Sequence, residues 1–278
     1  ISNKKMVESF NGYDEKYNND NAAAIEAGKI EALALFSVKK KKKASGIKSR
    51  YVMDKAGVLD TDIMCPRIPE RGNDEPSLLA EMGVNAAKQA LKEAQLEAND
   101  IDAVLVACAN LQRAYPAISI EIQDLLGIDG FAFDMNVACS SATFGIQTGY
   151  DMIRSGSAKR VMMLNTEVCS GHLNFRDRDS HFIFGDVATA VILEDAEMAK
   201  NKQGFEIVDT RLVTKFSNNI RNNFGFLNRT APENRDDDDK LFIQEGRKVF
   251  REVSPMVAQL ITDHLADNNL QASGFRRM

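Results

Sequence analysis

Between residues 76 and 195, hydrophobic positions recur with two different spacings. Apolar residues three or four positions apart predict helices, and short continuous apolar runs bounded by polar residues predict strands that are buried on both faces. The expected helices are 76–97, 118–126 (closed by Gly127) and 140–154, and the expected strands are 102–109, 130–138, 161–164 and 188–194. Strands that alternate with helices indicate an α/β fold with a mostly parallel sheet covered on both sides.

The segments on either side of this region have other patterns. The expected elements there are helix over residues 5–35, a strand at 205–213, a polar loop at 218–240 and a long amphipathic helix at 241–268. The change of pattern after Asp195 predicts two half-domains, residues 1–195 and residues 196–278.

The junction at Cys139 is the segment with the clearest chemistry. A predicted strand ends just before it, and a predicted helix of small residues begins just after it. A cysteine at a helix N-terminus lies in the positive field of the helix dipole, which favours the thiolate and lowers the thiol pKa. Backbone N–H groups there can stabilise an oxyanion. The junction therefore suits a nucleophile that carries an acyl group as a thioester, with a buried structural cysteine as the alternative.

Composition narrows the possible functions further. The chain has 278 residues and a formal net charge of −5, so we expect no general affinity for nucleic acid. No apolar run is long enough to predict a membrane span, and residues 1–8 do not have the pattern of a signal peptide. Four cysteines without a Cys-x-x-Cys pair, and three histidines, predict no metal site and a cytoplasmic protein with reduced thiols. Five consecutive lysines at 39–43 are typical of a solvated surface, and a phosphate-binding patch is the alternative.

Six short segments, in this order along the chain, resemble one enzyme family. They are 46–51, 114–116, 133–140, 177–178, 183–186 and 246–251. The chain resembles β-ketoacyl-acyl carrier protein synthase III, the thiolase-fold enzyme that starts fatty-acid synthesis. The resemblance implies a thiolase-like fold with two related half-domains in α/β/α/β/α layers, a homodimer, and no tightly bound cofactor.

The resemblance also implies a two-stage reaction centred on Cys139. An acyl-CoA would acylate this cysteine, whose backbone N–H would form half of an oxyanion hole. Malonyl-acyl carrier protein would then lose carbon dioxide, and the resulting carbanion would attack the acyl group to give a 3-oxoacyl-acyl carrier protein. Arg178 would hold the coenzyme A nucleotide, although an ion pair with Asp177 or Asp179 is an equal alternative.

Other roles follow from the same resemblance. Tyr115 and Phe144 would contribute to the acyl pocket, Tyr115 from across the dimer interface, with an ordinary packed aromatic as the alternative for Tyr115. Arg251, assisted by Arg247 and Lys248, would meet the acidic carrier protein, and a solvated helix face is the alternative there. The turn before Asp186 is expected beside the active site, without a chemical step for the carboxylate.

The family supplies a histidine and an asparagine for the condensation step, and this sequence has no counterpart of either. We therefore expect a chain that is truncated at both ends, with an incomplete C-terminal half, and that condenses poorly by itself. Three functions remain open at this point: the condensing enzyme, a thiolase-fold acyltransferase that makes a different acyl product, and a non-catalytic truncated paralogue that acts as a dimer partner.

Overall fold

The computed structural model describes residues 1–36, 46–177, 182–199, 204–223 and 225–274. The chain divides into two compact units. One contains residues 1–68, 169–186 and 214–266, and the other contains residues 69–168, 187–213 and 267–278. Each unit combines three separate segments that contact one another in space. The predicted half-domains are two continuous ranges, 1–195 and 196–278, and they stay a prediction.

The unit that contains Cys139 is built on a four-stranded sheet with the order β2-β1-β3-β4. The strands are β1 (Ala103–Ala107), β2 (Phe131–Met135), β3 (Arg160–Glu167) and β4 (Val187–Glu194). The first three are parallel to one another, and β4 runs antiparallel to β3. Every residue of β1 is buried, as the continuous apolar run predicted for a strand in the middle of a covered sheet.

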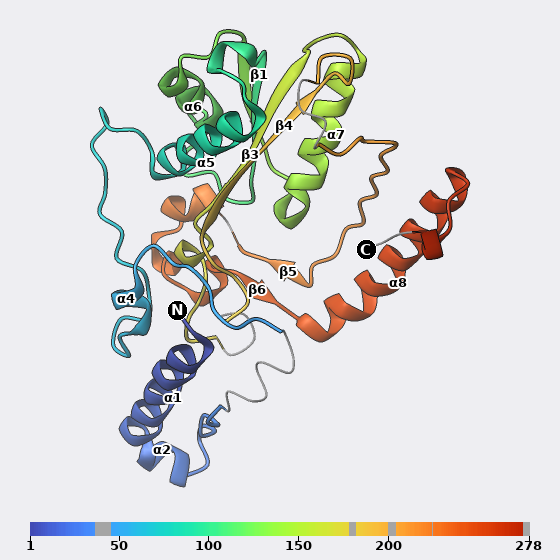
Figure 1. The fold of residues 1–278 in the computed structure, drawn as a ribbon. Helices are drawn as coiled ribbons and strands as arrows, with labels where there is room; N and C mark the ends of the chain where they lie inside the picture. Colours follow the sequence, from blue (N-terminus) through green and yellow to red (C-terminus); the bar gives the residue numbers. More distant parts are fainter. Residues whose placement is uncertain (37–45, 178–181, 200–203, 224, 275–278) are drawn as a thin grey trace. The chain divides into compact units, whose positions relative to one another are not determined.

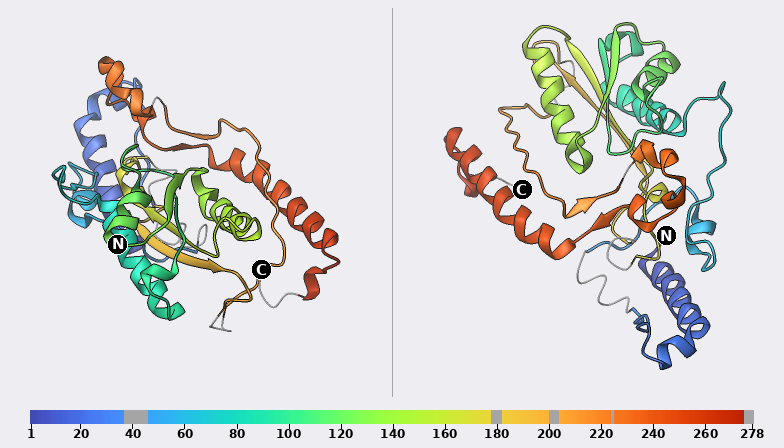
Figure 2. Two further views of the ribbon diagram at one scale, coloured as in Figure 1. Left: turned by 90° about the horizontal axis from the view of Figure 1, so that it is seen from above. Right: turned by 180° about the vertical axis from the view of Figure 1, so that it is seen from behind.

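Helices cover both faces of this sheet (Figures 1 and 2). Helices α5 (Leu78–Ala94) and α6 (Ile118–Leu126) lie on one face, and α7 (Ser141–Arg154) lies on the other. Side chains of β1 alternate accordingly: Val104 and Val106 pack in the cluster with α5 and α6, whereas Leu105 packs in the cluster on the α7 side. The predicted α/β architecture is therefore confirmed for this unit.

The helix boundaries match local sequence signals. Helix α6 ends where predicted, because Gly127 adopts a positive φ of 67° as its C-cap. Helix α5 begins after Ser77, whose hydroxyl accepts a hydrogen bond from the Ala80 N–H at 3.1 Å. Its buried stripe includes Gly83 and Val84.

The other unit contains α1 (Asn3–Asp20), α2 (Ala22–Glu26) and α4 (Lys55–Leu59). The prediction of a helix through residue 35 is wrong. The amide of Asn18 exchanges two hydrogen bonds with the backbone of Leu33, at 2.8 and 2.9 Å, and Asn11 does the same with Phe36 at 2.8 and 3.1 Å. These two asparagines on α1 hold the segment in a non-helical conformation, because their amides replace backbone partners.

The later part of the chain also departs from expectation. Residues 205–213 form no strand in the described residues, and Phe205 is fully exposed. The short strands β5 (Ile220–Arg221) and β6 (Ile243–Gln244) pair antiparallel, so α8 (Gly246–Asp267) begins later than predicted. The remaining helices of the described residues are short 3-10 helices. They are η1 (Ala98–Asp100), η2 (Ala138–Ser140), η3 (Cys169–Gly171), η4 (Gly225–Thr230), η5 (Pro232–Asn234), η6 (Asp238–Lys240) and η7 (Ala272–Gly274).

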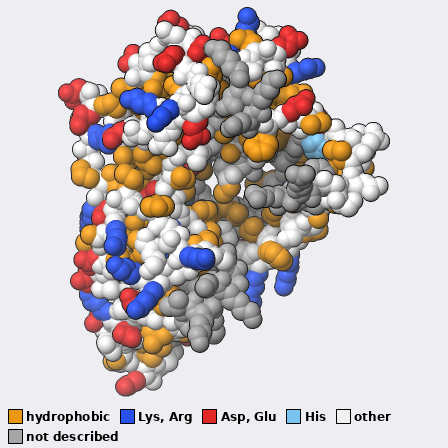
Figure 3. Space-filling model, in the orientation of Figure 1, with side chains coloured by type: hydrophobic (Ala, Val, Ile, Leu, Met, Phe, Trp, Pro, Cys, Tyr) orange, Lys and Arg blue, Asp and Glu red, His pale blue; other side chains and the backbone are white. Residues whose placement is uncertain are grey.

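Hydrophobic side chains reach the surface over much of the face drawn in Figure 3. The five lysines at 39–43, which we expected on a solvated surface, lie outside the described residues. Among the described residues, no helix combines the length and the apolar character needed to cross a bilayer.

Candidate active site at the Cys139 junction

Cys139 lies between the end of β2 and the start of α7, in the single turn Ala138–Ser140. Its side chain is exposed, in contrast to Cys108, which is fully buried at the end of β1. The alternative of a buried structural cysteine is therefore wrong for Cys139. This exposed thiol next to a helix N-terminus has the position expected of a nucleophile that must meet an external acyl group.

The backbone just before the cysteine is held in an unusual conformation. Ala138 has a positive φ of 48°, which is costly for a residue with a Cβ. Its N–H donates to Asn136 Oδ1 at 2.8 Å, and its carbonyl accepts from the Ser141 hydroxyl at 2.7 Å. The same hydroxyl accepts from the Val137 N–H at 2.9 Å. Two side chains thus fix the turn that precedes the nucleophile.

The Cys139 N–H makes no hydrogen bond with any of the residues that the structure describes, whereas the Ser140 N–H donates to the Val137 carbonyl at 3.1 Å. A free N–H beside an exposed thiol is what one half of an oxyanion hole requires. The thiolate expected from the helix dipole stays a prediction.

A half-buried carboxylate at the end of β3 supports the same edge of the sheet. Glu167 accepts a hydrogen bond from the Ala109 N–H, just beyond β1. Burial raises the pKa of the Glu167 carboxyl, and the hydrogen bonds from the backbone of Ala109 and Asn110 oppose that rise. Asn136 completes the connection, because its Nδ2 donates to the Ala109 carbonyl at 2.8 Å.

Sequence reasoning did not single out Asn136, Ser141 or Glu167. Asn136 and Ser141 flank the cysteine, and Asn and Ser in turns hydrogen-bond to nearby backbone, so their roles had a local signal. Glu167 lies 28 positions after Cys139 and ends a strand separated from β2 by β1. Its contact with Ala109 depends on tertiary structure, which the local sequence does not report.

The predicted pocket residues come from two elements around this edge. Tyr115 is 86% exposed in the loop before α6, and Phe144 is half-buried in the second turn of α7. The loop is anchored to β2, because the Asp134 carboxylate accepts hydrogen bonds from the N–H groups of Ile118 and Ser119, both at 2.8 Å. Asp134 therefore joins the Tyr115 loop to the strand that leads to Cys139.

In the other unit, hydrogen bonds explain the buried carboxylate of Asp186. Asp186 is buried and accepts hydrogen bonds from the Ser170 N–H and hydroxyl and from the Met53 N–H, at 2.6 to 2.8 Å. This bonding accounts for the carboxylate without a chemical step. Arg178, the predicted coenzyme A contact, lies outside the described residues.

The predicted carrier-docking residues lie together on the first turns of α8. Arg247, Lys248 and Arg251 are all exposed, and Lys248 pairs with Glu245. Arg247 and Arg251 are four positions apart, so they lie on the same face of the helix.

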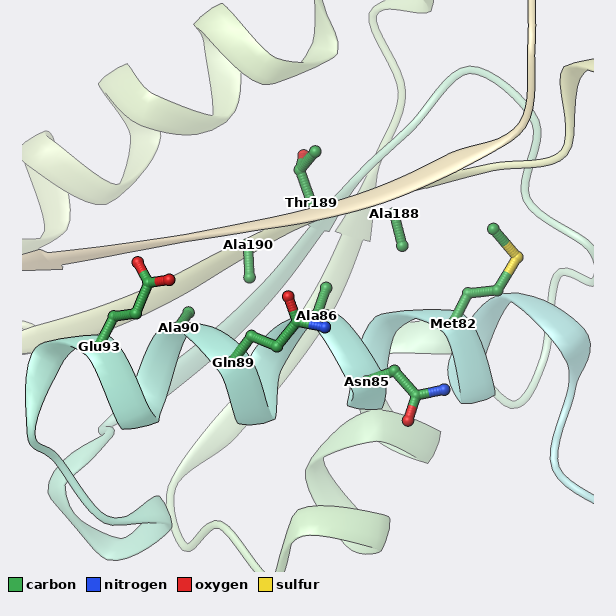
Figure 4. A pocket seen from close by; sticks show the side chains of 9 residues that line it. All are labelled: Met82, Asn85, Ala86, Gln89, Ala90, Glu93, Ala188, Thr189 and Ala190. Atoms are coloured by element: carbon green, nitrogen blue, oxygen red, sulfur yellow. The ribbon is translucent and has the colours of Figure 1, made fainter. Parts of the chain in front are cut away.

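A separate groove runs between α5 and β4 (Figure 4). Ala188 and Ala190 of β4 point into it, opposite Ala86 and Ala90 of α5. None of the predicted site residues that the structure describes lines this groove.

Comparison with solved structures identifies the fold as thiolase-like. The structure of 3-oxoacyl-(acyl carrier protein) synthase III from Pseudomonas aeruginosa PAO1 matches with a TM-score of 0.66 and 20% identity, over 85% of this chain and 65% of that chain. A family model described as 3-oxoacyl-[acyl-carrier-protein (ACP)] synthase III matches residues 133–215, a range that begins on β2 and includes Cys139.

Sequence relatives agree with this fold. A beta-ketodecanoyl-[acyl-carrier-protein] synthase of Pseudomonas aeruginosa is 59% identical over 98% of this chain and 77% of its own length. A beta-ketoacyl-[acyl-carrier-protein] synthase III of Acidiphilium cryptum is 33% identical over 68% of this chain and 57% of its own length. The chain therefore belongs to the 3-oxoacyl-[acyl-carrier-protein] synthase III family of condensing enzymes, and it spans between about half and three quarters of the length of these relatives.

Proposed function

We propose that this protein is an acyltransferase of fatty-acid synthesis, in which Cys139 accepts an acyl group from an acyl-CoA and passes it to malonyl-acyl carrier protein. The observation that carries this proposal is the exposed Cys139 thiol in a turn held by Asn136 and Ser141, at the start of α7. Family membership supports the same reaction.

In the first step, the Cys139 sulfur attacks the thioester carbon of the acyl-CoA. The carbonyl oxygen becomes an oxyanion, which the free Cys139 N–H is placed to stabilise. The bond from carbon to the coenzyme A sulfur then breaks, coenzyme A leaves as the thiol after taking a proton, and the acyl group stays on Cys139.

In the second step, malonyl-acyl carrier protein loses carbon dioxide, and the resulting carbanion attacks the acyl carbon. The bond from that carbon to the Cys139 sulfur then breaks, which releases a 3-oxoacyl-acyl carrier protein and returns the free cysteine. The described residues around Cys139 bear on the first of these two steps, because they leave the thiol exposed and its N–H free. No tightly bound cofactor takes part in either step.

The name of the 59% identical relative suggests the length of the acyl group. A beta-ketodecanoyl product has ten carbons, of which malonyl supplies two, so the primer of that relative has eight. We infer that the preferred primer of this protein is likewise an eight-carbon acyl-CoA. Tyr115 and Phe144 are the candidates for the wall of its acyl pocket.

The acidic carrier protein would bind on the first turns of α8. Arg247 and Arg251 have no acidic partner in the described part of the chain, and the exposed Phe250 lies between them in sequence. Exposed cations around an apolar side chain can attract an acidic partner over a distance and then bury apolar area on contact. The coenzyme A nucleotide would contact Arg178.

A homodimer is proposed on the exposed edge of the sheet. Strand β2 is at one edge of the described sheet, and its Phe131 and Phe133 side chains are 42% and 37% exposed. Exposed aromatic side chains on an edge strand favour association with a second copy. We propose a cytoplasmic location, which the reduced thiols expected from the sequence favour. All four cysteines are free.

The test is an intact mass spectrum of the protein before and after incubation with acyl-CoAs of two to twelve carbons. We expect a mass increase of one acyl group, largest for the eight-carbon substrate, which is lost in Cys139→Ala. Cys65→Ala is the matched control, since Cys65 is also an exposed free thiol and its loss should leave the adduct intact. An adduct that survives Cys139→Ala, or no adduct with any acyl-CoA, would contradict the proposal.

A further inference from the structure

Two side chains outside the predicted site meet on a single residue next to the nucleophile's strand. Glu167, at the end of β3, accepts from the Ala109 N–H, and Asn136, just after β2, donates to the Ala109 carbonyl at 2.8 Å. Ala109 itself follows β1, the strand between these two. The N–H and the carbonyl of Ala109 therefore both form hydrogen bonds with side chains at the ends of the neighbouring strands.

Asn136 extends this connection to the nucleophile. Its other amide atom, Oδ1, accepts from the Ala138 N–H at 2.8 Å, and Ala138 immediately precedes Cys139. A continuous path of hydrogen bonds therefore runs from Glu167 through Ala109 and Asn136 to the Ala138 backbone. Interactions of this kind fix a residue's backbone without contacting its side chain.

The conformation at the end of this path needs such support. Ala138 has φ = 48°, which costs an L-residue on the order of 1–2 kcal/mol relative to the right-handed region. If the bond from Asn136 were lost, Ala138 could relax and reorient the Cys139 N–H and thiol together. A relaxation of about 1 Å can cost on the order of 100-fold in the rate of a reaction that requires alignment.

A role in holding the sheet together does not by itself explain a glutamate at position 167. Its Oε2 is buried and has no hydrogen-bond partner in the described residues. An unsatisfied buried oxygen opposes folding, and an apolar residue of similar size would avoid that cost.

We propose that Asn136 and Glu167 are positioning residues for the acylation of Cys139: through Ala109 and Ala138 they hold the cysteine's N–H and thiol in the alignment that an acyl-CoA requires. This inference rests on the proposed function, because it concerns the rate of the same acylation. Ser141 holds the opposite side of the turn and is not part of this path.

The experiment compares two reactions of the same thiol. Single-turnover acylation by octanoyl-CoA requires the aligned oxyanion donor, whereas alkylation by iodoacetamide requires only an accessible thiol. Asn136→Ala and Glu167→Ala should slow acylation by about 10- to 100-fold and change alkylation by less than about 3-fold, a split that general unfolding would not produce.

Conservative variants locate the effect on the hydrogen bonds. Glu167→Gln keeps an acceptor oxygen for the Ala109 N–H and should recover much of the acylation rate that Glu167→Ala loses. Asn136→Asp keeps the acceptor for Ala138 but not the donor to Ala109, so its rate should lie between the parent and Asn136→Ala. Asn85→Ala, an exposed asparagine on α5, is the matched control and should acylate at the parent rate.

Other results would overturn the positioning role alone, or the proposed function as well. Acylation at the parent rate in both alanine variants, or an equal loss of acylation and alkylation, would overturn the positioning role while leaving the proposed function intact. A parent protein that forms no adduct with any acyl-CoA of two to twelve carbons, yet alkylates normally at Cys139, would overturn the proposed function and this inference with it.

Discussion

The Asp186 carboxylate accepts a hydrogen bond from the Met53 backbone N–H at 2.7 Å, across 133 positions of sequence. The preceding residue makes the approach possible: a Cβ on Gly185 would lie 2.8 Å from the Tyr51 carbonyl oxygen. Two of the segments that carried the family resemblance, 46–51 and 183–186, are thus neighbours in the fold, and their residue types serve this contact.

Asp186→Ala should destabilise the protein by about 3 kcal/mol, because it leaves the Met53 and Ser170 N–H groups and the Ser170 hydroxyl without an acceptor in a buried site. Chemical denaturation of the variant and the parent measures the difference. Glu206→Ala, which removes an exposed carboxylate, should change stability by less than about 0.5 kcal/mol. A loss of less than about 1 kcal/mol in Asp186→Ala would show that the bonds are replaced by water.

Gly145 brings α7 close to the sheet, because a Cβ there would lie 3.0 Å from the Cβ of Ala107 and from Cγ of Met163. Gly145→Ala should therefore cost about 1–2 kcal/mol, even though alanine favours helix by about 1 kcal/mol. Gly149→Ala is the matched comparison. Its nearest neighbour is the flexible end of Leu193, at 2.5 Å, which can move aside.

Thermal unfolding of the two glycine variants decides between these expectations. We expect Gly145→Ala to melt at a lower temperature than Gly149→Ala, since the Ala107 Cβ is fixed to a strand and cannot rotate away. Equal melting temperatures would mean that the sheet and α7 adjust as easily as a side chain does.

His172 gives the folded state a predictable dependence on pH. Burial lowers the pKa of its imidazole below 6.5, and the charge of Asp186 opposes that shift. The unfolded chain then binds a proton more readily than the folded one, so stability falls as pH falls below about 6.5. His172→Phe should flatten the decrease in melting temperature between about pH 6.5 and pH 5.

The aromatic partner supplies the control for that experiment. The His172 ring meets the Phe242 ring edge to face, with centroids 5.9 Å apart. Phe242→Leu should lower the melting temperature at every pH and leave its pH dependence in place, because the imidazole remains. If His172→Phe keeps the parent's slope, the acid sensitivity belongs to other groups.

The sequence predicted the Cys139 unit well because its signals are local. Continuous apolar runs marked the buried strands, and Gly127 marked the end of α6. The error in residues 27–35 has the opposite cause. Alanine and leucine favour a helix there, but Asn11 and Asn18 on α1 bind the backbone of that segment, and tertiary hydrogen bonds override local propensity.

The site followed the same division. The position of Cys139 between a strand and a helix could be predicted from the local sequence, and its role as nucleophile stays a proposal. The contact of Glu167 with Ala109 could not be predicted, because only the parallel order of three strands brings the two together. The strand predicted at 205–213 failed for a related reason. An apolar alternation shows that a segment could pair, and it does not show which strand would pair with it.

Asp134 lets the acyl pocket be tested without touching the nucleophile. Its carboxylate caps α6 through the Ile118 and Ser119 N–H groups, so Asp134→Ala should cost about 1–2 kcal/mol and release the Tyr115 loop from β2. If Tyr115 lines the pocket, the rate of Cys139 acylation by octanoyl-CoA relative to acetyl-CoA should change several-fold, since a long chain contacts the wall and a short one does not. Asp124→Ala, which removes an exposed carboxylate near the other end of the same helix, should change neither stability nor chain preference by a comparable amount. An unchanged preference in Asp134→Ala, together with the expected loss of stability, would place the acyl chain away from the Tyr115 loop.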